Sequence, residues 1–248
     1  MLLLNMDLTP RQTQILKAII DEYISSAEAV GSETLDRKYA LGVSPATIRN
    51  EMAELTEKGF LQQLHTSAGR IPTAMGLRFY VSHLMQEKQM SLRDEVLCKE
   101  EIWDARFNLD KLLKETVLAL ARRTRTLAVA ATDGGDVYYA GASHILNMPE
   151  FYDIDVAQTV LSLLDQKLRL HQLFFEQSLS AEPIHIMFGS DLNWAHFSPV
   201  GVAFSRFNAG KTGDVTLGVI GPCRLNFPYV VPTIRYFSQL VGEIAQNF

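Results

Sequence analysis

Two helix starts of the same kind constrain the first part of this chain more than any other feature. Thr9-Pro10 and Ser44-Pro45 each place a capping hydroxyl before a proline at the first helical position. Apolar residues follow each start at helical spacing, and a shorter helix is predicted from Ser32. The turn at 40–43 is brief and contains one glycine, which suits two helices that meet at a steep angle. The sequence therefore predicts three short helices before Gly59.

A short strand and a turn-rich segment follow the third predicted helix. Residues 60–64 are strand-like, residues 65–70 are polar and bendable, and Ile71-Pro72 closes the segment. One further helix is expected over 77–84. Three helices followed by a hairpin are typical of a winged helix-turn-helix. We therefore predict a DNA-binding domain over residues 5–88.

The third predicted helix has an apolar face, formed by Ile48, Met52 and Leu55, and a polar edge. A helix that enters the major groove presents forked or short polar side chains to the bases, Arg to guanine and Asn to adenine. The predicted DNA-binding residues lie on this edge and in the following turn-rich segment: Ser44, Thr47, Arg49, Asn50, His65, Thr66, Ser67 and Arg70. Arg49 could equally clamp a phosphate or pair with Glu51 or Glu54, and a plain helical hairpin with solvated polar residues is the alternative.

After residue 88 the composition and the predicted elements change twice along the chain. Residues 89–126 are charged and almost free of glycine and proline, which predicts one or two connecting helices that either self-associate or pack against the next domain. Residues 127–248 are predicted to form an α+β domain, a central antiparallel sheet with flanking helices. Its strands are expected at 127–132, 137–140, 185–188, 201–207 and 214–220, with a break at Pro222, a tight turn at Gly134-Gly135, and helices from Asp155 and from about Tyr229.

Enzymatic patterns are weak. The six histidines show no HExxH or other paired-ligand spacing, no GxSxG stretch is present, and the two cysteines have no activating or zinc-binding context. We expect no catalytic residue, no metal and no cofactor. The net charge of −5 argues mildly against a protein that coats nucleic acid by bulk electrostatics, but it is compatible with a sequence-specific reader. Without a signal sequence or a long apolar run, a cytoplasmic protein with no membrane contact is expected.

Several stretches carry a more specific signal. They are the runs at 31–35 and 41–52, the string HTSAGRIPT at 65–73, GASHILNMPEF at 141–151, and GVIGP at 218–222. Together they resemble the HrcA family of heat-inducible transcription repressors. The resemblance implies a winged helix joined to a GAF-like domain, in a bacterial repressor that binds an inverted-repeat CIRCE operator of chaperone genes as a homodimer. It also implies that the GroE chaperonin maintains the activity, so that heat stress derepresses those genes.

One departure from the family concerns its dimer. Family members usually carry an inserted dimerising segment before the motif that begins at Gly141, whereas here a four-residue turn at 133–136 leads almost directly into it. A dimer surface is then expected on the 89–126 helices or on exposed faces of the last domain. Two alternative functions stand beside the repressor: a winged-helix regulator that senses a small molecule in its GAF-like domain, and a catalytic domain with a regulatory winged helix, which lacks a nucleophile, base and oxyanion set.

Overall fold

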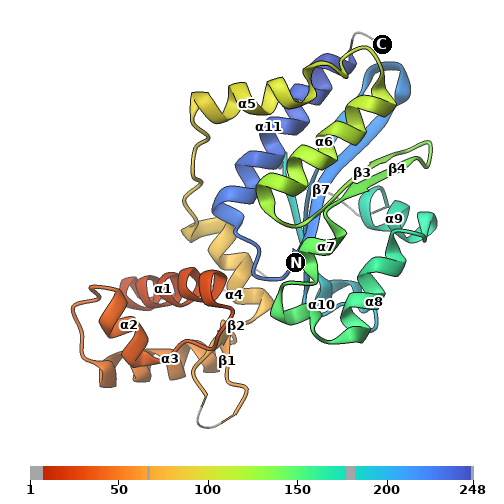
Figure 1. Cartoon of the computed structure of the whole chain (residues 1–248). Helices are drawn as coiled ribbons and strands as arrows, with labels where there is room; N and C mark the ends of the chain where they lie inside the picture. Colours follow the sequence, from red (N-terminus) through yellow and green to blue (C-terminus); the bar gives the residue numbers. More distant parts are fainter. Residues whose placement is uncertain (1–7, 66–67, 177–181, 247–248) are drawn as a thin grey trace. The chain divides into compact units, whose positions relative to one another are not determined.

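The computed structural model describes residues 8–65, 68–176 and 182–246. Contacts divide the chain into two units, Met1–Gln86 and Glu87–Phe248 (Figure 1). Helices and antiparallel sheets occur together, which confirms the predicted α+β class. In the part of the chain described, no helix is long and apolar enough to cross a membrane.

The first unit is built around three helices and a small two-stranded sheet. Its elements are α1 (Pro10–Ser26), α2 (Ser32–Lys38), α3 (Pro45–Glu57), β1 (Leu61–Gln62), β2 (Ile71–Pro72), α4 (Ala74–Phe79) and the π-helical turn η1 (Tyr80–Leu84). β1 and β2 are antiparallel, with Leu61 opposite Pro72. Ile15, Leu16 and Ile19 of α1 are fully buried, so α1 supplies the centre of the core that the other helices cover.

A five-stranded antiparallel sheet forms the middle of the second unit. The strands are β3 (Leu127–Thr132), β4 (Val137–Ala140), β5 (His185–Phe188), β6 (Val200–Asn208) and β7 (Asp214–Pro222), in the order β4-β3-β7-β6-β5. β3 pairs with its neighbour in sequence, β4, and with β7 from the far end of the chain. The turn between β3 and β4 contains Gly135 at φ +91°, as expected for a tight hairpin.

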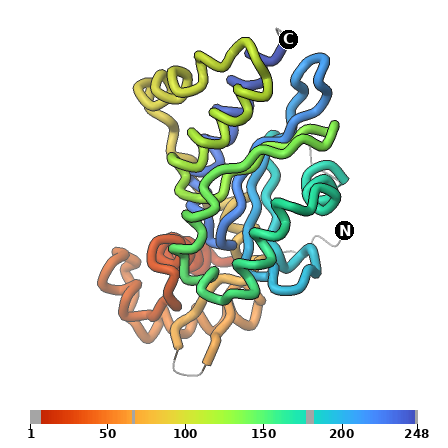
Figure 2. The backbone as a smooth tube through the Cα atoms, turned by 45° about the vertical axis from the view of Figure 1, so that its right-hand side comes forward, coloured from red at the N-terminus to blue at the C-terminus, as the bar shows by residue number. Residues whose placement is uncertain are grey.

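Helices cover both faces of this sheet (Figures 1 and 2). One side carries α6 (Leu109–Thr124) and α11 (Phe227–Ala245), with α5 (Leu92–Trp103) packed against them. The other side carries α7 (Ala142–Ile145), η2 (Pro149–Phe151), α8 (Ile154–Leu163), α9 (Lys167–Phe174) and α10 (Gly189–Leu192), while η3 (Gly210–Thr212) joins β6 to β7. Leu127 and Val129 point into the core under α8 and α9, whereas the intervening Ala128 faces the opposite layer.

Several element boundaries differ from the sequence predictions. α8 begins after Asp153, whose Oδ1 accepts the amide hydrogen of Asp155 at 3.0 Å, so the expected cap at Asp155 is wrong by two residues. β7 runs to Pro222 instead of ending before it. Pro222 is the last residue of the strand, a position where the missing N–H costs no further pairing. The three-part division into 5–88, 89–126 and 127–248 stays a prediction, and α5 and α6 belong to the second unit.

Candidate nucleic-acid interface

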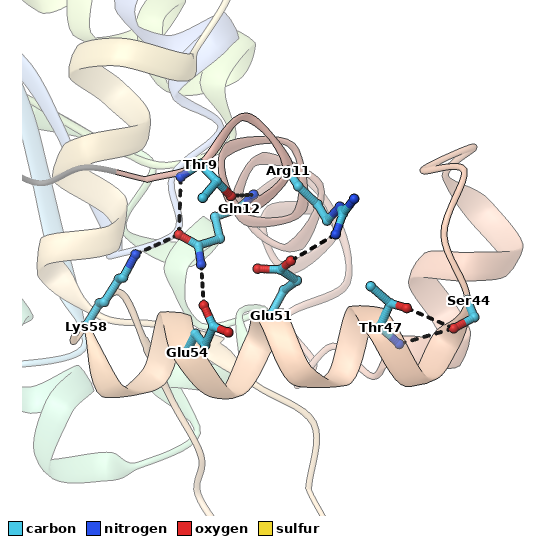
Figure 3. Close-up of polar contacts among 8 residues, drawn as sticks. All are labelled: Thr9, Arg11, Gln12, Ser44, Thr47, Glu51, Glu54 and Lys58. Carbon is cyan, nitrogen blue, oxygen red and sulfur yellow. Dashed lines mark hydrogen bonds and ion pairs between the residues drawn. The ribbon is translucent and has the colours of Figure 1, made fainter.

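The start of α3 is fixed by its own side chains. Ser44 Oγ accepts the backbone N–H of Thr47 at 3.2 Å and lies 3.0 Å from Thr47 Oγ1 (Figure 3). Pro45 occupies the first helical position, where a missing N–H is harmless. This cap gives α3 a defined N-terminus, and Ser44 remains exposed there.

The buried face of α3 holds the helix against the rest of the first unit. Ile48 and Leu55 are fully buried and Met52 nearly so, in contact with α1 and α2. Because all three fall on one side, the helix has a single orientation in which its polar edge faces outward. The predicted amphipathic pattern of this helix is confirmed.

The outward edge of α3 carries Ala46, Arg49 and Asn50, all exposed. Within the described ranges, neither the Arg49 side chain nor the Asn50 side chain forms a hydrogen bond or ion pair with another residue. The alternative in which Arg49 pairs with Glu51 or Glu54 is therefore not adopted. Thr47 is half-buried, and its hydroxyl already meets Ser44, so it offers less free surface than its two neighbours.

Glu51 and Glu54 are instead engaged with α1. Gln12 of α1 is only 1% exposed. Its Nε2 donates to Glu54 Oε2 at 2.7 Å, and its Oε1 accepts from Lys58 Nζ at 2.8 Å (Figure 3). Glu51 forms an ion pair of 3.5 Å with Arg11. Gln12 also completes the capping box of α1 with Thr9, and the sequence did not predict that the same amide joins α1 to α3.

The segment after α3 returns to that helix through Arg70. Arg70 Nε donates to Thr56 Oγ1 at 3.0 Å, and its backbone exchanges two 2.9 Å hydrogen bonds with Val30. His65 is exposed, while Thr66 and Ser67 lie outside the described residues. Thr56 follows Ser44 by twelve positions, about 18 Å along a helix. The predicted site residues on α3 lie near its start, whereas Arg70 contacts it near its end, so these residues do not converge on one point.

Another group of polar contacts joins α1 to the end of α2 and to the turn η1. Glu22 of α1 binds Lys38 Nζ at 2.5 Å and Tyr39 Oη at 3.4 Å, and Tyr80 Oη donates to Asp21 at 2.6 Å. Burial, with the charge of Glu22 next in importance, raises the pKa of Tyr39 to about 12, and burial also raises the pKa of Tyr80. Both phenols therefore stay protonated near neutral pH and act as hydrogen-bond donors that tie α1 to its neighbours.

The charge of the first unit is nearly balanced. Residues 1–86 contain eight Lys and Arg and nine Asp and Glu. Arg11, Lys17 and Lys38 are paired with carboxylates of the same unit. Nucleic-acid binding by this unit would therefore depend on a few well-placed residues rather than on bulk charge. In the described chain, no group of three or more His, Cys, Asp or Glu could hold a metal ion.

Comparisons with known proteins agree on one family. Residues 75–231 match the HrcA protein C terminal domain. Two relatives named heat-inducible transcription repressor HrcA come from Clostridium acetobutylicum, 42% identical with 98% of each chain covered, and Carboxydothermus hydrogenoformans, 28% identical with 96% of this chain and 98% of the relative covered. A crystal structure of a hypothetical protein shares the fold, with a TM-score of 0.76 at 16% identity over 97% of this chain and 99% of that one.

The relatives are longer than this chain. The two alignments extend over 343 and 338 positions, whereas the chain has 248 residues. Each alignment covers almost all of this chain and almost all of the relative. The difference in length therefore lies inside the alignment, consistent with the absence of an internal segment from this chain. The match covers both units, and the chain belongs to the HrcA family.

Proposed function

We propose that the chain is a transcription repressor that reads double-stranded DNA with α3. In this proposal the first unit is a winged helix: α2 and α3 form the helix-turn-helix, and the segment between β1 and β2 is the wing. The second unit is the GAF-like domain of the family, with its sheet enclosed between helix layers. The names of the relatives support the repressor function, and the geometry of α3 supports the mode of binding.

The single observation that carries this proposal is the unpartnered edge of α3. Arg49 and Asn50 are exposed next to each other on a helix whose opposite face is buried. A guanidinium donates two parallel hydrogen bonds to guanine O6 and N7, and a side-chain amide pairs in the same way with adenine N6 and N7. With α3 in the major groove, Arg49 and Asn50 read bases, Thr47 contacts a neighbouring base edge, and Ser44 positions the backbone.

The hairpin supplies the phosphate contacts in this arrangement. Arg70 uses Nε internally, which leaves its terminal nitrogens for a phosphate beside the C-terminal half of α3. His65, Thr66 and Ser67 belong to the same wing and contribute backbone or minor-groove contacts. Phosphate contacts position a protein on DNA without selecting sequence, so these residues affect affinity more than specificity.

The family resemblance extends the proposal to the operator. We infer a cytoplasmic homodimer that binds a CIRCE-type inverted repeat, with the two α3 helices in major grooves one or a few helical turns apart, about 34 Å per turn. Loss of GroE support during heat stress releases the repressor. Footprinting on the chaperone promoters of the same genome tests the operator, and adding GroE to the binding reaction tests the chaperonin.

Substitutions at α3 separate base reading from general binding. Arg49→Ala and Asn50→Ala are each expected to lose about 1–3 kcal/mol of discrimination at one operator position, measured by competition with single-base operator variants. Arg49→Lys keeps the charge but not the fork, so it retains non-specific affinity and loses specificity. Gln14→Ala, an exposed amide on α1, is the matched control for Asn50. Unchanged selectivity in both Ala variants refutes the assignment of α3.

A further inference from the structure

Helix α5 has one face that the second unit does not use. Its buried side, with Cys98 and Ile102 fully buried, packs on α6 and α11, and Tyr236 Oη of α11 donates to the carbonyl oxygen of Glu95 at 2.8 Å. Another flank exposes large apolar side chains that follow one another along the helix and into the next turn: Leu92 at 82%, Val96 at 54%, Trp103 at 40% and Phe107 at 77%. Figure 1 shows α5 at the outer side of the helix layer formed by α6 and α11.

The spacing of these residues makes them a stripe rather than a scatter. Leu92, Val96 and Trp103 lie at positions i, i+4 and i+11, which share one side of an α-helix. The Lys99 ammonium lies on the same side, 4.7 Å from the centre of the Trp103 ring. Single exposed apolar residues are ordinary, but a contiguous row on one helix marks an interaction site.

The charged residues on both sides of this apolar stripe favour one binding partner, a second copy of α5. Arg93 and Glu100 lie along one border, Glu95 and Lys99 along the other. Two copies of α5 packed antiparallel bring like borders together, so Arg93 of each copy lies beside Glu100 of the other. Glu95 and Lys99 meet in the same way, and Leu92 lies opposite Trp103. Both borders are therefore attractive in a symmetric pair.

We propose that α5 is a dimerisation surface whose occupant is α5 of a second copy, packed antiparallel about a two-fold axis near Val96. This inference rests on the proposed homodimer and specifies its interface. It replaces the role of the inserted segment that the longer relatives carry. Because a two-fold contact uses the same patch on both subunits, one helix suffices to build it.

The position of α5 in the chain suits a dimeric DNA reader. Lys88 N donates to Pro228 O, and Glu87 binds Arg235 through both guanidinium nitrogens, which fixes the chain to α11 just after the first unit ends. Leu92 follows Glu87 by only five positions, a span of at most about 17 Å. The two copies of Leu92 lie about 14 Å apart along the paired helices, so half-sites about 34 Å apart are within reach.

The size of the contact sets its expected strength. One pair of short helices lies at the low end of the area that specific interfaces bury. We expect self-association in the micromolar range without DNA and tighter association on an operator with two half-sites, because both first units then bind at once.

Sedimentation of the full chain over a micromolar concentration range tests the surface. Val96→Glu is expected to weaken dimerisation about tenfold or more, because an unpaired charge would be buried. Leu118→Glu changes a comparably exposed apolar residue on α6 and is the matched control. Arg93→Glu and Glu100→Arg are each expected to weaken the dimer, and the double variant restores it, since every inter-copy pair then has opposite charges again.

The results of these experiments distinguish a wrong interface from the absence of a dimer. A chain that dimerises equally well with Val96→Glu and gains nothing from the double charge swap uses another surface, which overturns this inference and leaves the dimer intact. A chain that remains monomeric even on an inverted-repeat operator overturns both. Restoration by the charge swap cannot come from a folding defect, because it recovers binding by adding a second substitution.

Discussion

At the residue scale, the buried side-chain amide of Gln12 has two structural roles. Gln12 completes the capping box of α1 and also bonds to Glu54 and Lys58 of α3. A buried donor or acceptor that loses its partner costs more than the bond itself contributes. The orientation of α3 against α1 therefore depends on a buried residue that lies outside the exposed edge of α3.

Replacing Gln12 by Leu should destabilise the first unit by about 1–3 kcal/mol, because Glu54 loses its amide partner at the edge of the core. Both tryptophans, Trp103 and Trp194, lie in the second unit. Tryptophan fluorescence therefore does not report on α1, and hydrogen exchange of the α1 and α3 amides is the suitable measurement. Gln14→Leu on the exposed side of α1 is the control, and equal protection in both variants would contradict the assigned role.

The phenol of Tyr39 predicts a pH dependence. Burial and Glu22 raise its pKa to about 12, above the value of about 10 in an unfolded chain. Since the folded state holds the proton more tightly, this contribution to stability is complete below pH 10 and is lost as pH rises toward 12. Tyr39→Phe should therefore show a smaller loss of stability across that interval in pH-dependent unfolding. Tyr80, whose pKa is also raised, keeps part of the dependence in the variant; identical pH curves would contradict the prediction.

At the element scale, the hairpin after α3 is held to that helix by a side-chain hydrogen bond. Arg70 reaches Thr56 near the C-terminal end of α3, which ties the start of β2 to that helix. Arg70→Ala should weaken binding to every sequence and reduce the salt slope of log K by about 1. Thr56→Val removes only the internal partner and should keep the wild-type slope. A wild-type slope in Arg70→Ala would show that Arg70 serves the fold alone.

The turn into α7 gives a second test at this scale. Gly141 has φ +80°, and a Cβ there would lie 2.4 Å from the carbonyl oxygen of Thr126. Gly135 also has a positive φ, +91°, but a Cβ there would meet nothing within 4 Å beyond its own chain neighbours. Gly141→Ala should lower the free energy of unfolding by several kcal/mol. Gly135→Ala should lower it by only about 1 kcal/mol, because backbone strain is then the sole cost. Urea unfolding followed by the fluorescence of the two tryptophans, both in the second unit, compares the two variants, and equal losses would remove the contact argument.

At the scale of the whole molecule, the sequence predicted most elements and few of the contacts between them. Caps and periodicity located α1, α3, β3 and β4 because these signals are local. The internal engagement of Arg70 with Thr56 and of Glu54 with Gln12 was not predictable, since each pair is brought together only by packing. Short motifs spread between residues 31 and 222 identified the family, which no count of charges or apolar residues could have done.

The strand order has a consequence for the order of events during synthesis. The first unit contains every residue of its own core once Gln86 has been made. β3, by contrast, pairs with β7, whose residues 214–222 come almost last. On the ribosome the first unit can therefore fold long before the sheet that follows it. In the interval, the fully buried apolar strand β3 has one unfilled edge. Completion of the sheet therefore waits until almost the whole chain has been made.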